Sequence, residues 1–200
     1  MSTPNLSVAE RSRAARIGAV LFRNRSWLPV PFLLLPLLAP GTQTTRGWLF
    51  GGAFILVGEV IRLAGVAAAG SVTRRRSRDV QRLVTYGIFA WLRNPLYVGN
   101  LFAWLGFVVG SGVLWFLPVA LVLFAIEYTL IVRYEEGVLE SIFGGEYVAY
   151  KERTPRWFPA PPSNVASGEH DWGEALRSEL STLAQYAALA GAFWIKTRMS

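Results

Sequence analysis

The sequence predicts an all-helical (all-α) integral membrane bundle with four membrane spans and a fifth candidate. Hydrophobic residues make up 52% of the 200 residues and charged residues only 16%, against about 25% charged in soluble domains. The apolar residues are gathered in long runs, and the basic residues lie between these runs. Together these observations point to lipid as the solvent of the fold.

Composition also excludes several classes of site. The chain has no cysteine and one histidine, His170, which argues against disulfides, thiolate metal sites and histidine-based catalysis. The net charge of +7 is typical of a membrane protein with basic cytoplasmic loops facing anionic lipid. We therefore expect membrane lipids as partners, no nucleic acid and no metal.

The first two apolar runs differ in how well they fit a membrane-spanning helix. Residues 27–40 are short for a span and hold four prolines, so this helix must be kinked or broken. Residues 48–70 are long enough, and they carry Glu59 and Arg62 three apart on one helical face. An internal salt bridge and the wall of a substrate tunnel are equally good interpretations of these two residues.

The third and fourth runs form a predicted hairpin. Residues 96–110 and 113–132 are separated only by a tight turn at Ser111 and Gly112, which makes the two helices antiparallel. Glu127 in the fourth run is a further ionisable group in lipid and a candidate partner for Arg62. The tail from residue 171 is helical in pattern, and its apolar stretch 180–195 either inserts or lies in the interface.

Basic residues set the predicted orientation. They precede the first run and follow the second, whereas the loop between these runs holds only Arg46. The positive-inside rule therefore places the N-terminus and residues 74–86 in the cytoplasm, and the hairpin returns residue 133 and its successors to the same face. The first fifteen residues are polar and lack a short apolar core with a cleavage site, so no removable signal peptide is expected.

Two segments that meet at this face carry candidate chemistry. In the first, residues 86–100, Asn94 is a predicted helix N-cap with Pro95 at the first helical position, and Arg93 lies beside the free amides. Such a helix start is common in itself, but it is also a ready anion site. Gly99 lets another helix or a ligand approach closely.

The second segment, residues 133–155, contains the adjacent carboxylates Glu135 and Glu136. At the predicted end of the fourth helix they oppose the helix dipole, so local stability does not explain them, although a solvated helix end is the simpler interpretation. Adjacent side chains point about 100° apart, so each would engage a different group. A cationic ligand with hydroxyls would suit both.

The joint pattern over residues 86–159 resembles a known superfamily. It reads Gly-x-x-x-x-x-Arg-Asn-Pro-x-Tyr-x-Gly, Arg-x-Glu-Glu, and Phe-Gly-x-Glu-Tyr-x-x-Tyr-x-x-Arg-x-Pro. This is similar to the isoprenylcysteine carboxyl methyltransferase and phospholipid methyltransferase superfamily. The resemblance implies an integral membrane enzyme that binds S-adenosylmethionine at the cytosolic face, in a site formed by the hairpin and the loop after it. It also implies a lipophilic acceptor delivered from the bilayer.

The resemblance assigns roles to individual residues. Arg93 and Arg153 are expected to be catalytic, since Arg153 matches a basic residue near the substrate carboxylate in the prenylcysteine enzymes. The residues expected to bind the cofactor are Gly87, Asn94, Pro95, Tyr97, Gly99, Glu135, Glu136 and Tyr147. Asn94 stands where the family usually has His, and it cannot titrate.

This departure bears on the reaction. A carboxylate acceptor needs no general base, whereas a protonated amine does, so carboxylate O-methylation is favoured. Phospholipid or amine N-methylation and a non-catalytic family member remain alternatives; a nicotinamide-dependent reductase would need a dinucleotide motif that is absent. We expect residues 1–85 to hold the first spans, 86–160 the methyltransferase core and 161–200 the tail. Lateral access for the lipid is expected between the second run and the hairpin, with Arg62 and Gly99 on its walls.

Overall fold

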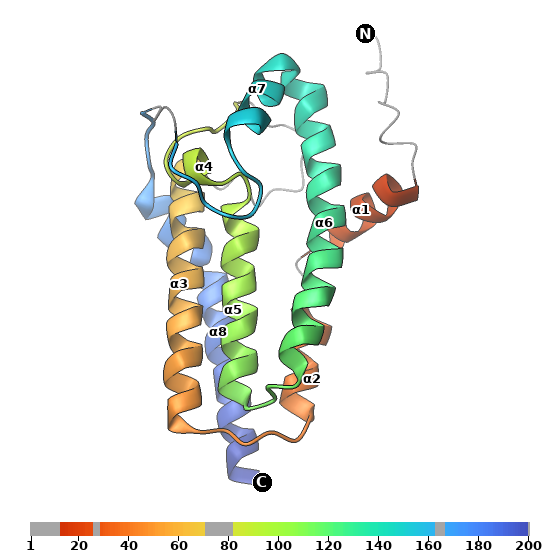
Figure 1. Cartoon of the computed structure of the whole chain (residues 1–200). Helices are drawn as coiled ribbons and strands as arrows, with labels where there is room; N and C mark the ends of the chain where they lie inside the picture. Colours follow the sequence, from red (N-terminus) through yellow and green to blue (C-terminus); the bar gives the residue numbers. More distant parts are fainter. Residues whose placement is uncertain (1–12, 26–28, 71–81, 163–166, 200) are drawn as a thin grey trace.

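The computed structural model describes residues 13–25, 29–70, 82–162 and 167–199, and the regular elements of this part are all helices. The long helices α3 (Thr45–Ala69), α5 (Pro95–Ser111), α6 (Phe116–Phe143) and α8 (Trp172–Met199) form a bundle (Figure 1). The short helices are α1 (Arg13–Asn24), which packs on α6, α2 (Pro29–Leu38), which packs on α5, and α4 (Ile88–Trp91) and α7 (Gly145–Arg153) at one end. The predicted all-helical class is confirmed for the described residues.

The outer surface of the bundle is apolar over the middle of α3 and α6. Leu56 and Val60 on α3 and Val122 and Ile126 on α6 are each between 56% and 65% exposed. Soluble monomers rarely present so many large apolar side chains together to water. Among the described helices, α3 and α6 are also long and apolar enough to cross a membrane. The protein is therefore a membrane protein.

The expected count of four spans is not confirmed. Helix α2 has only 10 residues and holds Pro36 inside it, so it is about 15 Å long, half the thickness of a bilayer core. By itself it cannot cross, and the first run does not form a span in its described part. The apolar helix α5 has 17 residues, about 26 Å, slightly short of the usual length.

The predicted hairpin is present, but its second arm is longer than expected. Gly112 ends α5 in the left-handed conformation at φ 71°, and the chain reverses into α6 (Figure 1). Helix α6 continues to Phe143, well beyond the expected end at residue 132. Glu135 and Glu136 therefore lie inside a helix, and the expectation that they stand at its C-terminus against the dipole is wrong.

Helices α3 and α5 pack closely through glycine. A Cβ atom on Gly58 would lie 2.5 Å from the carbonyl oxygen of Gly99, and a Cβ on Gly99 would lie 2.6 Å from that of Gly58. The Arg62 side chain also covers Gly99. Small residues allow such close approach of helices in lipid. The expectation of a gap for lipid here, lined by Arg62 and Gly99, is therefore wrong, because these two residues pack against each other.

The tail forms one helix, α8, that runs alongside α3 within the bundle (Figure 1). Its start is fixed where the backbone N–H of Asp171 donates to the Ala67 carbonyl at 2.9 Å. Near its end, Lys196 donates to the carbonyls of Pro36 and Ala39 at the end of α2. With 28 residues it has the length of a span, and it is held against the other helices at both ends.

Candidate active site

The loop after α7 holds the linker between α4 and α5 in place. The backbone N–H of Arg93 donates to the Pro155 carbonyl at 2.9 Å, and that of Ala160 donates to the Trp91 carbonyl at 3.1 Å. The Tyr150 hydroxyl donates to the carbonyl of Phe89 in α4 at 2.8 Å. The two predicted segments therefore meet at one end of the bundle, as the sequence analysis expected.

Asn94 takes part in the same contact. It occupies the N-cap position of α5, with Pro95 following at the start of the helix. Its side chain makes no capping hydrogen bond; instead its Nδ2 donates to the Arg156 carbonyl at 3.1 Å. The prediction of the N-cap position is confirmed, but the expected capping contact is wrong, because the amide is used to fix the loop.

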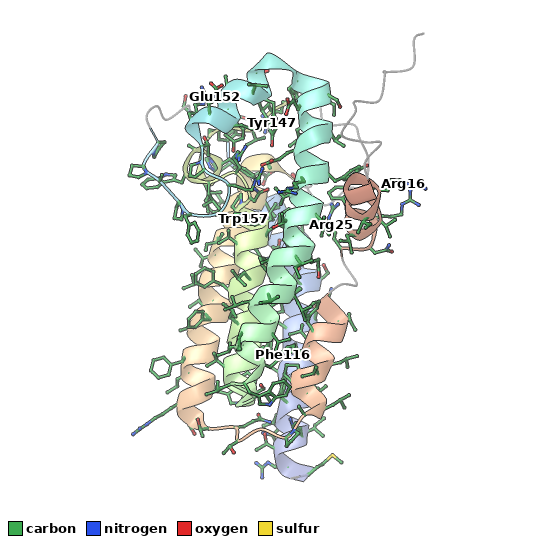
Figure 2. The ribbon with its side chains drawn as sticks, turned by 45° about the vertical axis from the view of Figure 1, so that its right-hand side comes forward. Arg16, Arg25, Phe116, Tyr147, Glu152 and Trp157 are labelled. Atoms are coloured by element: carbon green, nitrogen blue, oxygen red, sulfur yellow. The ribbon has the colours of Figure 1, made fainter. Side chains whose placement is uncertain are left out.

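The two acidic residues have different partners, as their directions on the helix require. The Tyr97 hydroxyl, at the start of α5, donates to Oε2 of Glu135 at 2.9 Å. The positive charge of Arg25, after α1, acts on the Glu135 carboxylate. Figure 2 shows Arg25 on the side of α1 that faces α6, whereas Arg16 points away from the bundle.

Glu136 binds two arginines. Its Oε1 lies 3.3 Å from Nη1 of Arg93, and it also accepts from Nε of Arg156 at 3.1 Å. Arg93 is 10% exposed; its Nη1 is held by the ion pair with Glu136, and its buried Nε makes no hydrogen bond to any described group. Buried donors of this kind are costly unless a partner satisfies them. An anionic ligand group beside Arg93 would supply that partner.

The ring centroids of Tyr147 and Tyr150, both in α7, lie 5.9 Å apart. Figure 2 shows Tyr147 at this end of the bundle. Both tyrosines are buried. Burial raises the pKa of the Tyr147 hydroxyl well above its usual range, and the negative charge of Glu136 adds to the rise. Burial also raises the pKa of Tyr150, although Arg93 and Arg153 oppose this. Both hydroxyls are therefore protonated at neutral pH and are poor general bases.

For three other predicted site residues, Arg153, Gly87 and Gly99, the structure shows only exposure or packing. Arg153 is exposed at the end of α7. Gly87 has φ 59°, and a Cβ there would meet the ring of His170. Gly99 faces α3, as described above. Each of these two glycines therefore has a structural reason to be glycine in addition to the proposed contact with a cofactor.

Sequence reasoning missed two basic residues of this site, Arg25 and Arg156. Arg156 follows the matched motif directly and pairs with Glu136. A buried carboxylate needs a counter-charge, and this requirement was the available signal. Arg25 lies far from the motifs in sequence, so only the packing of α1 on α6 brings it near Glu135.

A family model described as phospholipid methyltransferase matches residues 47–146, half of the 200-residue chain. The chain belongs to this family. The match begins in α3 and ends at the start of α7, so it contains the hairpin and both acidic residues. The loop that pairs Arg156 with Glu136 and the helix α8 lie outside it.

Curated relatives named protein-S-isoprenylcysteine O-methyltransferase are similar to this family member. The mouse protein is 34% identical over 122 residues, which cover 56% of this chain and 42% of the relative. The human protein is 34% identical over 117 residues (54% and 40%), and form B from Arabidopsis thaliana is 30% identical over 118 residues (55% and 58%). The chain thus spans about half the length of the curated relatives it matches. No solved structure matches it significantly.

Proposed function

We propose that this protein transfers a methyl group from S-adenosylmethionine to a lipophilic acceptor at the cytosolic face of a membrane. The observation that carries the proposal is the position of Arg93 in a member of a methyltransferase family: it is 10% exposed and ion-paired with Glu136 of the acidic pair, and its Nε makes no hydrogen bond to a described group. The proposed orientation, with this site on the cytosolic side of the membrane, follows from the distribution of basic residues along the sequence. When bound, the cofactor supplies a sulfonium methyl group that is already activated.

The residues present fit such a cofactor. The Nε of Arg93 makes no hydrogen bond to a described group and could donate to a carboxylate, which guanidinium groups bind well. Glu135 and Glu136 could accept hydrogen bonds from an ammonium group or from hydroxyls of the cofactor, which would replace Tyr97 and the arginines as their partners. The ring faces of Tyr97 and Tyr147 suit a sulfonium, with an attraction of about 0.5–2 kcal/mol. Asn94 and Pro95 hold the start of α5 in register with these groups.

O-methylation of a carboxylate is the favoured reaction. Asn94 cannot titrate, and Tyr147 and Tyr150 hold their protons, so these residues offer no base for a protonated amine. A carboxylate needs only alignment with the methyl group and exclusion of water. Arg153, at the exposed edge of the site, would attract the anionic head of such an acceptor. The acceptor class is that of the curated relatives' printed name, an isoprenylated cysteine.

A second candidate is N-methylation of a phospholipid amine. The description of the matching family model favours it. Both reactions use a lipophilic acceptor, so access from the membrane does not separate them. The chemical stability of the product does.

A labelled-methyl assay tests the two reactions. The full chain in detergent is given methyl-labelled S-adenosylmethionine with either N-acetyl-S-farnesylcysteine or phosphatidylethanolamine. Treatment with base releases methanol from a methyl ester and leaves an N-methyl group in place. Base-labile label on the prenylcysteine is the expected result. Base-stable label on the phospholipid would establish the second candidate, and no transfer to either would contradict the proposal.

A further inference from the structure

A buried polar cluster lies in the interior of the bundle, away from the acidic pair. Arg62 on α3 is its centre and Glu179 on α8 is fully buried. Nη2 of Arg62 donates to both carboxylate oxygens of Glu179 at 2.9 Å. Glu59, one turn earlier on α3, lies 3.7 Å from Nε of Arg62. The predicted pairing of Arg62 with Glu127 is wrong, because Glu179 takes this place.

Charges in the interior of a membrane protein are expensive to bury. Each ion removed from water costs several kcal/mol, and such groups in spans usually mark a functional element. Lys196 and Asp171 already hold the two ends of α8 without burying an ion pair between helices. The docking of α8 therefore does not by itself account for the pair of Arg62 and Glu179.

The cluster extends toward the candidate active site. Arg62 also donates through Nη1 to Oδ1 of Asn100 on α5, and Nδ2 of Asn100 donates to the hydroxyl of Tyr128 on α6 at 3.3 Å. The Tyr128 ring contacts that of Tyr97, with centroids 4.9 Å apart. Tyr97 in turn donates to Glu135. A continuous series of contacts thus joins α8 to the acidic pair.

We propose that Arg62 is a positioning residue for the methyl-transfer site. Held by Glu179, its guanidinium orients the Asn100 amide, which fixes Tyr128 and, through the ring contact, the Tyr97 hydroxyl that faces Glu135. Helix α8, outside the matched family region, thereby becomes part of the functional unit. The inference rests on the proposed function only for its effect on cofactor binding; the coupling between α8 and Tyr97 stands independently of it.

The test compares three variants of the full chain in detergent. Glu179→Gln keeps the shape of the side chain but removes the charge that holds Arg62, and Tyr128→Phe removes only the hydroxyl that Asn100 contacts. Lys196→Met is the matched control, because it removes a contact of α8 outside the series. Melting temperatures show whether the three variants fold. If Glu179→Gln does not fold, Tyr128→Phe still tests the inference.

The first readout is the environment of Tyr97, followed by fluorine NMR on protein labelled with 3-fluorotyrosine. The Tyr97 signal is assigned with Tyr97→Phe. Glu179→Gln and Tyr128→Phe are expected to shift it, and Lys196→Met is expected to leave it in place. A Tyr97 signal that moves in neither variant, or moves equally in Lys196→Met, overturns the inference whether or not the protein is a methyltransferase.

The second readout is binding and turnover of S-adenosylmethionine. We expect Glu179→Gln and Tyr128→Phe to raise Kd and KM for the cofactor about threefold or more, in line with coupling through contact networks. kcat at saturating cofactor should change less, because Arg62 does not touch the reacting groups. Equal Kd values in parent and variants contradict the inference. Absence of cofactor binding in the parent protein contradicts the proposed function instead.

Discussion

Tyr97 donates a 2.9 Å hydrogen bond to Glu135, a residue 38 positions later in the chain. The bond joins the first turn of α5 to the C-terminal part of α6, across the hairpin that the family model covers. Glu136, next in sequence, faces Arg93 and Arg156 instead. The acidic pair is therefore divided between two sets of partners, and each set suggests its own test.

The acidic pair is expected to be needed for cofactor binding. Changing Glu135 and Glu136 together to Gln should weaken the binding of S-adenosylmethionine at least tenfold, roughly 1.4 kcal/mol. The amides keep the size of the side chains but remove both negative charges. Isothermal titration on the folded double variant measures this change. An unchanged dissociation constant would remove the pair from the site.

The two arginines are expected to differ in importance. Arg93 is 10% exposed and ion-paired with Glu136, whereas Arg153 is exposed. Arg93→Gln should lower kcat/KM more than Arg153→Gln does, by at least about tenfold, because charge-assisted bonds in a buried site are the stronger ones. The labelled-methyl assay compares the two variants. Fast transfer in both would mean that these residues serve only to bind lipid phosphate.

Asn94 offers a test of the departure from the family pattern. Asn94→His should be tolerated or improve activity, since it restores the residue usual in the family and keeps an N–H that can reach the Arg156 carbonyl. Asn94→Ala should cost about 1 kcal/mol of stability through the loss of that hydrogen bond. Thermal unfolding and methyl transfer are measured together. If the alanine variant matches the parent in both, the position is only part of a linker.

The contact between α3 and α5 predicts opposite effects for two glycines in one helix. Gly58→Ala places a methyl group against the carbonyl of Gly99 and should destabilise the protein by about 1–3 kcal/mol, a usual cost of overpacking. A Cβ atom on Gly52 would meet nothing within 4 Å. Because alanine favours a helix more than glycine does, Gly52→Ala should stabilise α3 by up to about 1 kcal/mol. Unfolding of both variants in detergent is compared. Equal effects would argue against the close packing of these helices.

The orientation can be measured directly because the chain contains no cysteine. Glu152→Cys, in α7, and Arg46→Cys, in the first turn of α3, change exposed residues at opposite ends of the helix bundle. In sealed inside-out vesicles a membrane-impermeant thiol reagent should label the first and not the second. The reverse result would place the site outside the cytoplasm, and equal labelling would contradict the crossing of α3.

Local patterns in the sequence determined the helices and the candidate motifs. Run length predicted α3, and the turn at Ser111 and Gly112 predicted the hairpin. The resemblance to the methyltransferase superfamily predicted that Arg93, Glu135 and Glu136 belong to one site. Periodicity and turn chemistry act over a few residues, so they are readable without the fold. The end of α6 was misjudged, because a polar sequence does not stop a helix when tertiary contacts such as that of Glu136 with Arg156 satisfy it.

Only the tertiary structure decided which residues pair. Asn94 bonds to a loop carbonyl instead of capping its helix, and Arg62 pairs with Glu179, 117 positions away, instead of Glu127. Partners so distant in sequence are chosen by which helix faces pack together, and close contacts such as that of Gly58 with Gly99 fix those faces. A charge or a polar group in a sequence states only that a partner is needed, because burial without one is costly. The packing of the helices selects that partner.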